Sequence, residues 1–90
     1  ELDVMWVHKG GHDPVTEATR FKDRLPLLHL KDYVPGNDPQ WVPAGQGVVD
    51  LAPVIEIGKA AGTKFGAVEL DHSPNDDPMS AVAASVEYLR

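Results

Sequence analysis

Short apolar runs and helix-like segments alternate along the chain. The apolar runs cover residues 1–7 (ELDVMWV), about 25–31 (LPLLHLK) and about 64–70 (KFGAVEL). Runs of this length, bounded by Gly, Pro and Asp, are typical of strands. Apolar residues at helical spacing follow each run. The order of the elements therefore predicts three consecutive strand–helix units, with parallel strands joined by right-handed crossovers.

An aspartate precedes each predicted helix. Asp13 with Pro14, Asp50, and Asp77 with Pro78 suit the N-cap and the first helical turn. The helices are predicted from 14 to about 24, over 51–61 with a left-handed stop at Gly62, and from 78 onward. We expect the packed faces to consist of Val15, Ala18, Phe21 and Lys22, of Leu51, Val54, Ile55 and Gly58, and of Met79, Val82, Val86 and Leu89.

The connection from 33 to 48, YVPGNDPQWVPAGQGV, is rich in Pro and Gly. It is longer than the usual link between a strand and a helix in such units. We therefore expect this segment to contribute to function rather than only to join two elements.

Strand alternation separates the polar residues of the predicted sheet from its apolar ones. Successive side chains of a strand point to opposite faces. Leu28 and Leu30 would share the helix-covered face, and His29 and Lys31 would share the other. By the same alternation, Asp3 (with Met5) and Glu69 (with Asp71) lie opposite the apolar positions of their strands. Each strand thus places one metal-ligand residue type on the same side of the sheet.

Two explanations of this pattern remain open on the residues alone. His29 is either a hydrogen-bonded core histidine, with Asp3 and Glu69 as ordinary strand-end charges, or part of a metal site. Buried carboxylates must be paired, hydrogen-bonded or metal-bound. Two carboxylates and one imidazole suit Mn²⁺, Mg²⁺, Co²⁺ or Zn²⁺ with open coordination positions.

Composition and charge narrow the classes of function. The formal net charge is −6, which disfavours a binder of nucleic-acid backbone. The chain has no cysteine, so His, Asp and Glu are its strong ligand candidates. No apolar run approaches the roughly 18 residues of a membrane span. We expect a cytoplasmic protein, and because the chain starts at Glu1 in mid-pattern, we expect an upstream segment.

Several motifs resemble one enzyme family. RLPLLHLKDY, VPAGQGVVDLAPVI and AVELDHSPNDDPMSAVAASVEYL are similar to the C-terminal third of the xylose-isomerase-like sugar phosphate isomerases and epimerases, which include ketose 3-epimerases and inosose dehydratases. The opening DVMWVHKGGHDP is similar to the family's sixth-strand segment. The resemblance covers nearly the whole chain.

The resemblance implies an α/β fold in which residues 1–90 form strands and helices 6–8 of a TIM (β/α)₈ barrel, the C-terminal part of a single domain. Strands 1–5 would lie outside this chain. The family's metal ligands map to Asp3, His29 and Glu69. The fourth ligand, a glutamate on the fifth strand, would precede Glu1, and Glu1 is a poor substitute for it.

The resemblance also implies roles for the surrounding residues. Glu69 would be both a metal ligand and a catalytic acid/base. Lys31, Trp6 and His72 would contact substrate, with Trp6 standing where many sugar epimerases have His. Asp32 would orient neighbours or cap a loop. Mn²⁺ is the expected cofactor, with Mg²⁺, Co²⁺ and Zn²⁺ as alternatives. A second metal site at His8 and His12 is not expected, because the residues between them are predicted to form a loop.

The implied function is metal-dependent isomerisation or epimerisation of a sugar or sugar phosphate, by proton transfer through an enediolate held on the metal. The alternatives are a polyol-ketone dehydratase of the same fold and a non-catalytic fragment of such an enzyme. A DNA-repair endonuclease of a related barrel is disfavoured by the −6 charge. We expect a small sugar or polyol as partner, without nucleic acid or membrane. The N-terminal remainder of the barrel would be needed for activity, so the 90-residue chain alone should be inactive, and homo-oligomers are compatible with the sequence.

Overall fold

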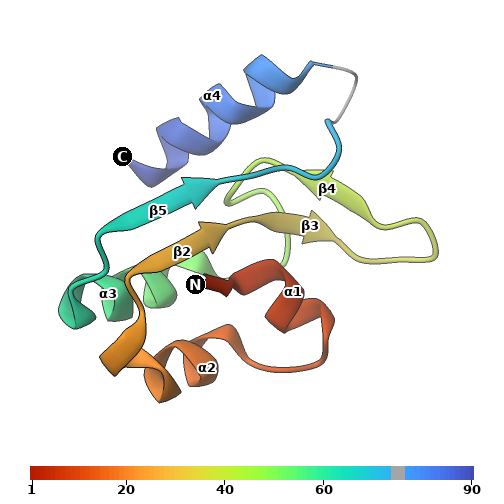
Figure 1. Cartoon of the computed structure of the whole chain (residues 1–90). Helices are drawn as coiled ribbons and strands as arrows, with labels where there is room; N and C mark the ends of the chain where they lie inside the picture. The colour runs from red at the N-terminus through yellow and green to blue at the C-terminus, as the bar shows by residue number, and fades with distance from the viewer. Residues whose placement is uncertain (74–76) are drawn as a thin grey trace.

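The computed structural model describes residues 1–73 and 77–90. Strands and helices alternate as in Figure 1. In chain order the elements are β1 (Leu2–Asp3), α1 (Val4–Lys9), α2 (Pro14–Arg20), the 3₁₀ helix η1 (Lys22–Arg24), β2 (Leu27–Leu30), β3 (Asp32–Val34), β4 (Gln40–Val42), α3 (Leu51–Ala61), β5 (Phe65–Val68) and α4 (Pro78–Leu89).

The main sheet is parallel and has the order β1–β2–β5. Asp3 pairs with His29, and His29 pairs with Ala67, so the three strands are in register at this level. The three parallel strands and their helices agree with the α/β class predicted from the sequence. Strands β1 and β5 are the edges of this sheet.

The first predicted strand is wrong over most of its length. Only Leu2 and Asp3 are extended, and Val4–Lys9 form the helix α1. The Asp3 carboxylate accepts a hydrogen bond from the Trp6 backbone N–H at 3.1 Å and so caps this helix. The neighbours Val4 and Met5 are both fully buried, which a half-exposed strand does not allow. Met5 and Trp6 therefore follow helical rather than strand spacing.

The later helix boundaries agree only in part with the prediction. Helix α2 ends at Arg20, and Lys22 is an exposed residue of η1, so neither the end near 24 nor the packed position of Lys22 is correct. Helix α3 spans the predicted residues and stops at Gly62 with φ +79°. Asp50 precedes it but makes no side-chain capping bond. Among the described residues, no helix is long and apolar enough to cross a membrane.

The packed face of helix α4 agrees only in part with the predicted one. Met79 and Val86 are exposed, while Ala81 and Ser85 are buried. The Ser85 hydroxyl donates to the Ala81 carbonyl and accepts from the Ala44 N–H, each at 3.0 Å. The hydrogen bond to the loop at Ala44 turns Ala81 and Ser85 inward and leaves Met79 and Val86 outside, whereas Leu89 of the predicted face still packs against the core.

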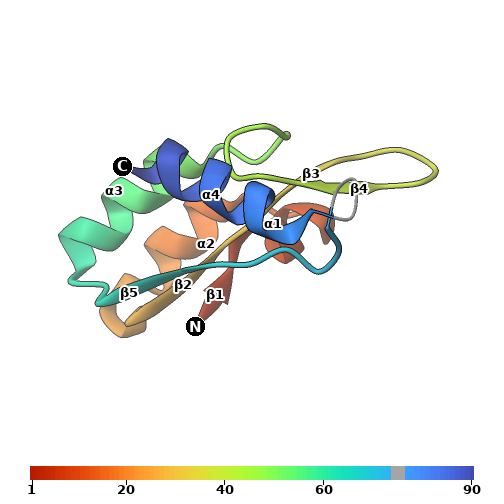
Figure 2. The ribbon, with the colours of Figure 1, turned by 90° about the horizontal axis from the view of Figure 1, so that it is seen from above.

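The core lies on one side of the sheet. Val4, Met5, Leu28, Leu51 and Val54 are among its buried side chains, and α2 and α3 cover this side in Figure 2. Alternation places Phe65 on the opposite side, and this ring is 68% exposed. The helix-free side of the sheet thus carries both exposed apolar surface, at Phe65, and the polar side chains of His29 and Lys31.

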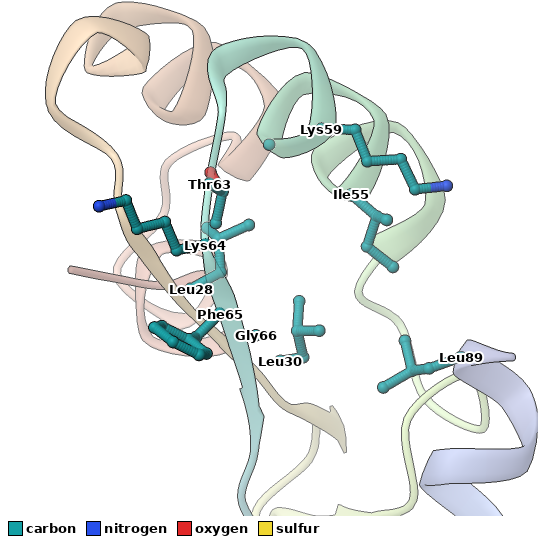
Figure 3. A pocket seen from close by; sticks show the side chains of 10 residues that line it. Leu28, Leu30, Ile55, Lys59, Thr63, Lys64, Phe65, Gly66 and Leu89 are labelled. Atoms are coloured by element: carbon teal, nitrogen blue, oxygen red, sulfur yellow. The ribbon is translucent and has the colours of Figure 1, made fainter.

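An apolar cleft of about 270 Å³ opens between β5, α3 and α4. Leu30, Ile55 and Leu89 line it from three elements (Figure 3). Leu30 and His29 are consecutive strand residues, so the cleft lies on the opposite face of β2 from His29. This cleft is therefore separate from the titratable side chains on the His29 side of the sheet.

Candidate metal centre

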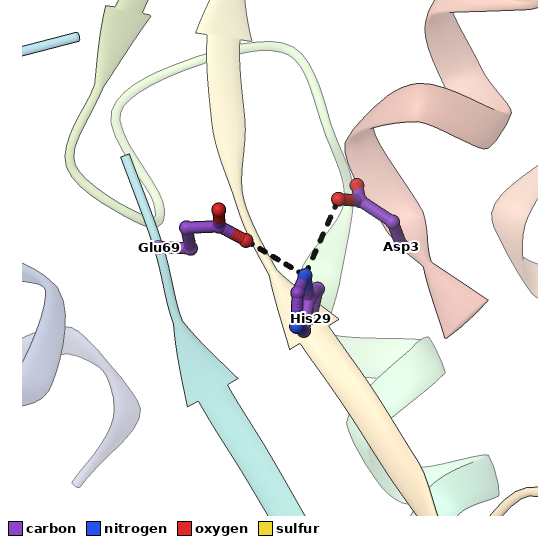
Figure 4. A group of neighbouring side chains, drawn as sticks. All are labelled: Asp3, His29 and Glu69. Atoms are coloured by element: carbon purple, nitrogen blue, oxygen red, sulfur yellow. Dashed lines mark ion pairs between the residues drawn. The ribbon is translucent and has the colours of Figure 1, made fainter. Parts of the chain in front are cut away.

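Three parallel strands bring Asp3, His29 and Glu69 to one place. Asp3 ends β1, His29 lies in β2, and Glu69 directly follows β5. Figure 4 shows both carboxylates directed at the same ring nitrogen: His29 Nδ1 lies 2.7 Å from Glu69 Oε2 and 3.5 Å from Asp3 Oδ2. One ligand atom from each residue lies within 4.8 Å of the others. Strand register and alternation account for this convergence.

The His29 ring faces carboxylates through both nitrogens. Its Nε2 lies 3.1 Å from Glu1 Oε1, on the other side of the ring from Glu69 and Asp3. A neutral imidazole donates from only one nitrogen. A second proton or a cation is therefore needed for both contacts to be favourable. Glu1 orients the ring and is not part of the three-ligand group.

Lys31 lies at the centre of the acidic groups. Its side chain is 2% exposed, and its Nζ lies 2.9 Å from Asp71, 3.2 Å from Asp3 and 3.4 Å from Glu69. It follows His29 by two residues and so points to the same side of the sheet. A buried lysine is costly unless it is paired, and here three carboxylates pair with it.

The pKa values of Lys31 and Asp71 show how closely this pair is coupled. Burial by itself would lower the pKa of Lys31, but hydrogen bonds to Asp71 and Asp3 outweigh burial and raise it above the ordinary value. Burial would likewise raise the pKa of Asp71, but hydrogen bonds from Lys31 and Trp41 hold it below the ordinary value. Both groups are therefore charged around neutral pH.

The donor set fits a divalent metal ion. Asp3, Glu69 and Asp71 bring three negative charges and Lys31 brings one positive charge, so a net charge of −2 remains around Lys31, apart from the Glu1 carboxylate at His29 Nε2. A dication would neutralise this charge and would take the place of a proton between His29 Nδ1 and the carboxylates. Two carboxylates and an imidazole leave coordination positions open for substrate oxygens.

Asp32 organises the loop beside this site. Its buried carboxylate accepts hydrogen bonds of 2.8–3.0 Å from the backbone N–H groups of Tyr33, Gly45, Gly47 and Val49. These bonds fasten the connection before α3 to the end of the central strand. The sequence-based expectation that Asp32 orients its neighbours agrees with this geometry.

Gly47 leaves room for the Asp32 carboxylate. Replacing Gly47 by alanine therefore tests how tightly the loop packs on Asp32. A Cβ at this position would overlap Asp32 Oδ1 and the Tyr33 carbonyl oxygen. Gly47→Ala should therefore destabilise the protein by roughly 2–3 kcal/mol in urea unfolding. Gly62→Ala is the comparison, since its Cβ meets nothing within 4 Å and only the positive φ is penalised, at about 1 kcal/mol. An equal or smaller effect at Gly47 would contradict the steric argument.

The predicted substrate-contact residues lie in different settings. Trp6 is 46% exposed, and Lys31 Nζ lies 5.8 Å from its ring centroid. His72 is further out and packs edge-on against Trp41 with the ring centroids 4.8 Å apart. Lys31 contacts the ligand carboxylates directly. Trp6 thus borders the cluster, whereas His72 lies beside Trp41 and next to Asp71 in the chain.

Trp41 and the role of Asp71 in this site were not predicted from the sequence. The connection from 33 to 48 contains an antiparallel hairpin, in which Tyr33 pairs with Trp41. The Trp41 indole donates to Asp71 Oδ2 at 2.9 Å, and Lys31 bonds the other oxygen of that carboxylate. In the sequence, Asp71 is indicated by the strand face that it shares with Glu69. Trp41 is indicated only by the unusual length of the connection that contains it.

Comparison with known proteins finds a partial match to the structure of an enzyme. The chain is similar to the crystal structure of a sugar phosphate isomerase/epimerase from Parabacteroides distasonis, with a TM-score of 0.78 and 29% identity. The match covers 99% of this chain and 29% of that protein. No protein-family model matches the sequence, and no curated protein matches it significantly.

The three strand–helix units thus match part of a larger α/β protein rather than a whole one. The predicted fold class, consecutive parallel βα units of a TIM barrel, is confirmed at this level. Over nearly all of its length, the chain has the fold of part of a sugar phosphate isomerase/epimerase.

Proposed function

We propose that this chain carries most of the active site of a metal-dependent sugar isomerase or epimerase. The observation that supports it best is the convergence of Asp3, His29 and Glu69 at the carboxyl ends of three parallel strands. Active sites of barrel proteins lie at this end of the strands. The activity described for the structural neighbour supports the same class of reaction.

The proposed metal is a divalent cation, with Mn²⁺ preferred over Mg²⁺, Co²⁺ and Zn²⁺, held by Asp3, His29 and Glu69. When bound, it would polarise a substrate carbonyl and hold adjacent hydroxyl oxygens. Glu69, whose side chain is 41% exposed, is accessible to move a proton on the carbon beside that carbonyl. Lys31 supplies positive charge beside the same oxygens, and Trp6 provides an apolar wall for the sugar.

We further propose that residues 1–90 act as the last three βα units of an eight-unit barrel. Both edge strands of the three-stranded sheet have room for neighbours, and Phe65 is exposed on its helix-free side. The chain spans 29% of the structural neighbour. A further glutamate from another strand would complete the metal ligands, so the 90-residue chain alone should be inactive.

The test uses the complete polypeptide that carries residues 1–90. We expect it to purify with, or bind, about one divalent ion per site, and Mn²⁺ to restore activity after chelation. A panel of ketoses and ketose phosphates should give epimers or aldose isomers as products. Metal content is measured by elemental analysis and products by NMR.

Three results would each overturn a part of the proposal. A dehydrated diketone as product would identify a polyol-ketone dehydratase instead. Full activity after complete metal removal would exclude a catalytic role for the Asp3, His29 and Glu69 group as a metal site. Turnover of a ketose by the 90-residue chain alone would disprove the need for a ligand from another strand.

A further inference from the structure

Lys9 lies among three aromatic rings beside the proposed metal centre. Its Nζ is 5.3 Å from the ring centroid of Trp6, 5.4 Å from that of Trp41 and 5.9 Å from that of Tyr33. Trp6 belongs to α1, as Lys9 does, whereas Tyr33 and Trp41 pair across the β3–β4 hairpin. Helix and hairpin therefore bound one cation from different sides.

The positive charge of Lys9 has no acidic partner in the part of the chain that the structure describes. Within residues 1–73 and 77–90, no carboxylate oxygen lies within 4.0 Å of its Nζ, in contrast to the three around Lys31. Cation–π contacts at exposed positions are weak. Lys9 is exposed, so an incoming anion can approach its ammonium and gain a charge-assisted hydrogen bond.

The aromatic walls connect Lys9 to the proposed metal centre. Both Lys9 Nζ and Lys31 Nζ face the Trp6 ring, at 5.3 Å and 5.8 Å from its centroid, which limits their separation to about 11 Å. Trp41 provides a second connection, because its indole donates to Asp71 and Asp71 pairs with Lys31. An extended sugar with a terminal acidic group can bridge such a separation.

We propose that Lys9 binds an anionic group, a carboxylate or a phosphate, at the far end of the substrate, with Trp6 and Trp41 bounding the sugar between the two sites. This inference rests on the proposed function and specifies its substrate class as acidic ketoses. The chain has a net charge of −6 and the centre itself is rich in carboxylates. The Lys9 ammonium would offset the repulsion between these carboxylates and an acidic substrate. It would also orient the neutral end of the substrate toward the metal centre.

Calorimetry measures the affinity of the complete polypeptide for three ligands that share one carbon skeleton. These are D-fructose, D-fructose 6-phosphate and D-fructuronate. We expect at least one acidic probe to bind about tenfold more tightly than D-fructose, as one charge-assisted contact would produce. Lys9→Met keeps the apolar stem and should abolish this preference. Lys9→Arg should keep most of it. Lys22→Met is the matched control, because Lys22 is an exposed lysine of η1, and it should leave the preference for the acidic probe unchanged.

The acidic probe that shows the Lys9-dependent preference distinguishes phosphate from carboxylate. An unchanged preference in Lys9→Met, or equal weakening of all three probes, would overturn the inference, because equal weakening indicates a structural role in packing α1 on the hairpin. The same measurements distinguish failure of the proposed reaction from failure of the proposed anion site. A Lys9-dependent preference without turnover of any ketose would reject the reaction and keep the anion site. Turnover without the preference would do the reverse, and absence of binding by all probes would reject both.

Discussion

Glu69→Gln is expected to lower kcat for ketose turnover by roughly 10²–10⁴-fold in the complete polypeptide, the usual contribution of a positioned acid/base group. Glutamine keeps the size of the side chain and one ligand oxygen, but it cannot accept the substrate proton. The side chain lies 2.7 Å from His29 Nδ1 and 3.4 Å from Lys31 Nζ, so its position is set by two contacts. Steady-state kinetics at saturating Mn²⁺ measures the effect.

Metal titration of the same variant separates loss of the base from loss of the ligand. If the metal content is restored at high Mn²⁺ while kcat remains low, Glu69 acts on the proton as proposed. Glu56→Gln is the matched control, because Glu56 is an exposed residue of α3 that pairs with Lys59, away from the metal centre. A kcat within a few-fold of the wild-type value at full metal occupancy would eliminate Glu69 as the acid/base group.

Asp32→Ala is expected to reduce the free energy of unfolding by roughly 3–4 kcal/mol, because four backbone N–H donors lose their shared acceptor in a buried place. Urea unfolding followed by circular dichroism measures this change. Activity should fall as well, since the loop from Gly45 to Val49 joins the hairpin that carries Trp41.

The comparison variant for Asp32 is Asp23→Ala, an exposed aspartate of η1. Its substitution should change the free energy of unfolding by less than about 0.5 kcal/mol. If Asp32→Ala also changed stability by so little, its four hydrogen bonds would not hold the loop. Asp32→Asn should also destabilise the protein, because each carboxylate oxygen accepts two backbone N–H groups and the amide puts an NH₂ donor in place of one of these oxygens.

The contrast between β2 and α1 illustrates what could be predicted from sequence. In β2 the alternation of Leu28, His29 and Leu30 has only one arrangement that buries both leucines, so the orientation of His29 was predictable. In the first apolar run, a strand and a helix both bury Val4. The Asp3 carboxylate caps the Trp6 N–H, and the parallel sheet pairs only Leu2 and Asp3 with β2, so the run becomes a helix.

Long-range contacts explain the other differences. The inner face of α4 depends on a bond between Ser85 and Ala44, which are far apart in the chain. Lys31 was predicted to lie near substrate, but its pairing with three carboxylates arises only when the ends of β1 and β5 meet it. Trp41 reaches Asp71 only because the segment from 33 to 48 folds back as a hairpin.

The sequence by itself determined the parallel βα order and the common side of Asp3, His29 and Glu69, because both follow from local periodicity and from the two-residue repeat of a strand. Only the tertiary structure decided which charges surround Lys31, how Asp32 holds its loop and which rings bound Lys9. These depend on the meeting of segments distant in sequence. The physical reason is that local patterns specify which way a side chain points, whereas packing specifies what it meets.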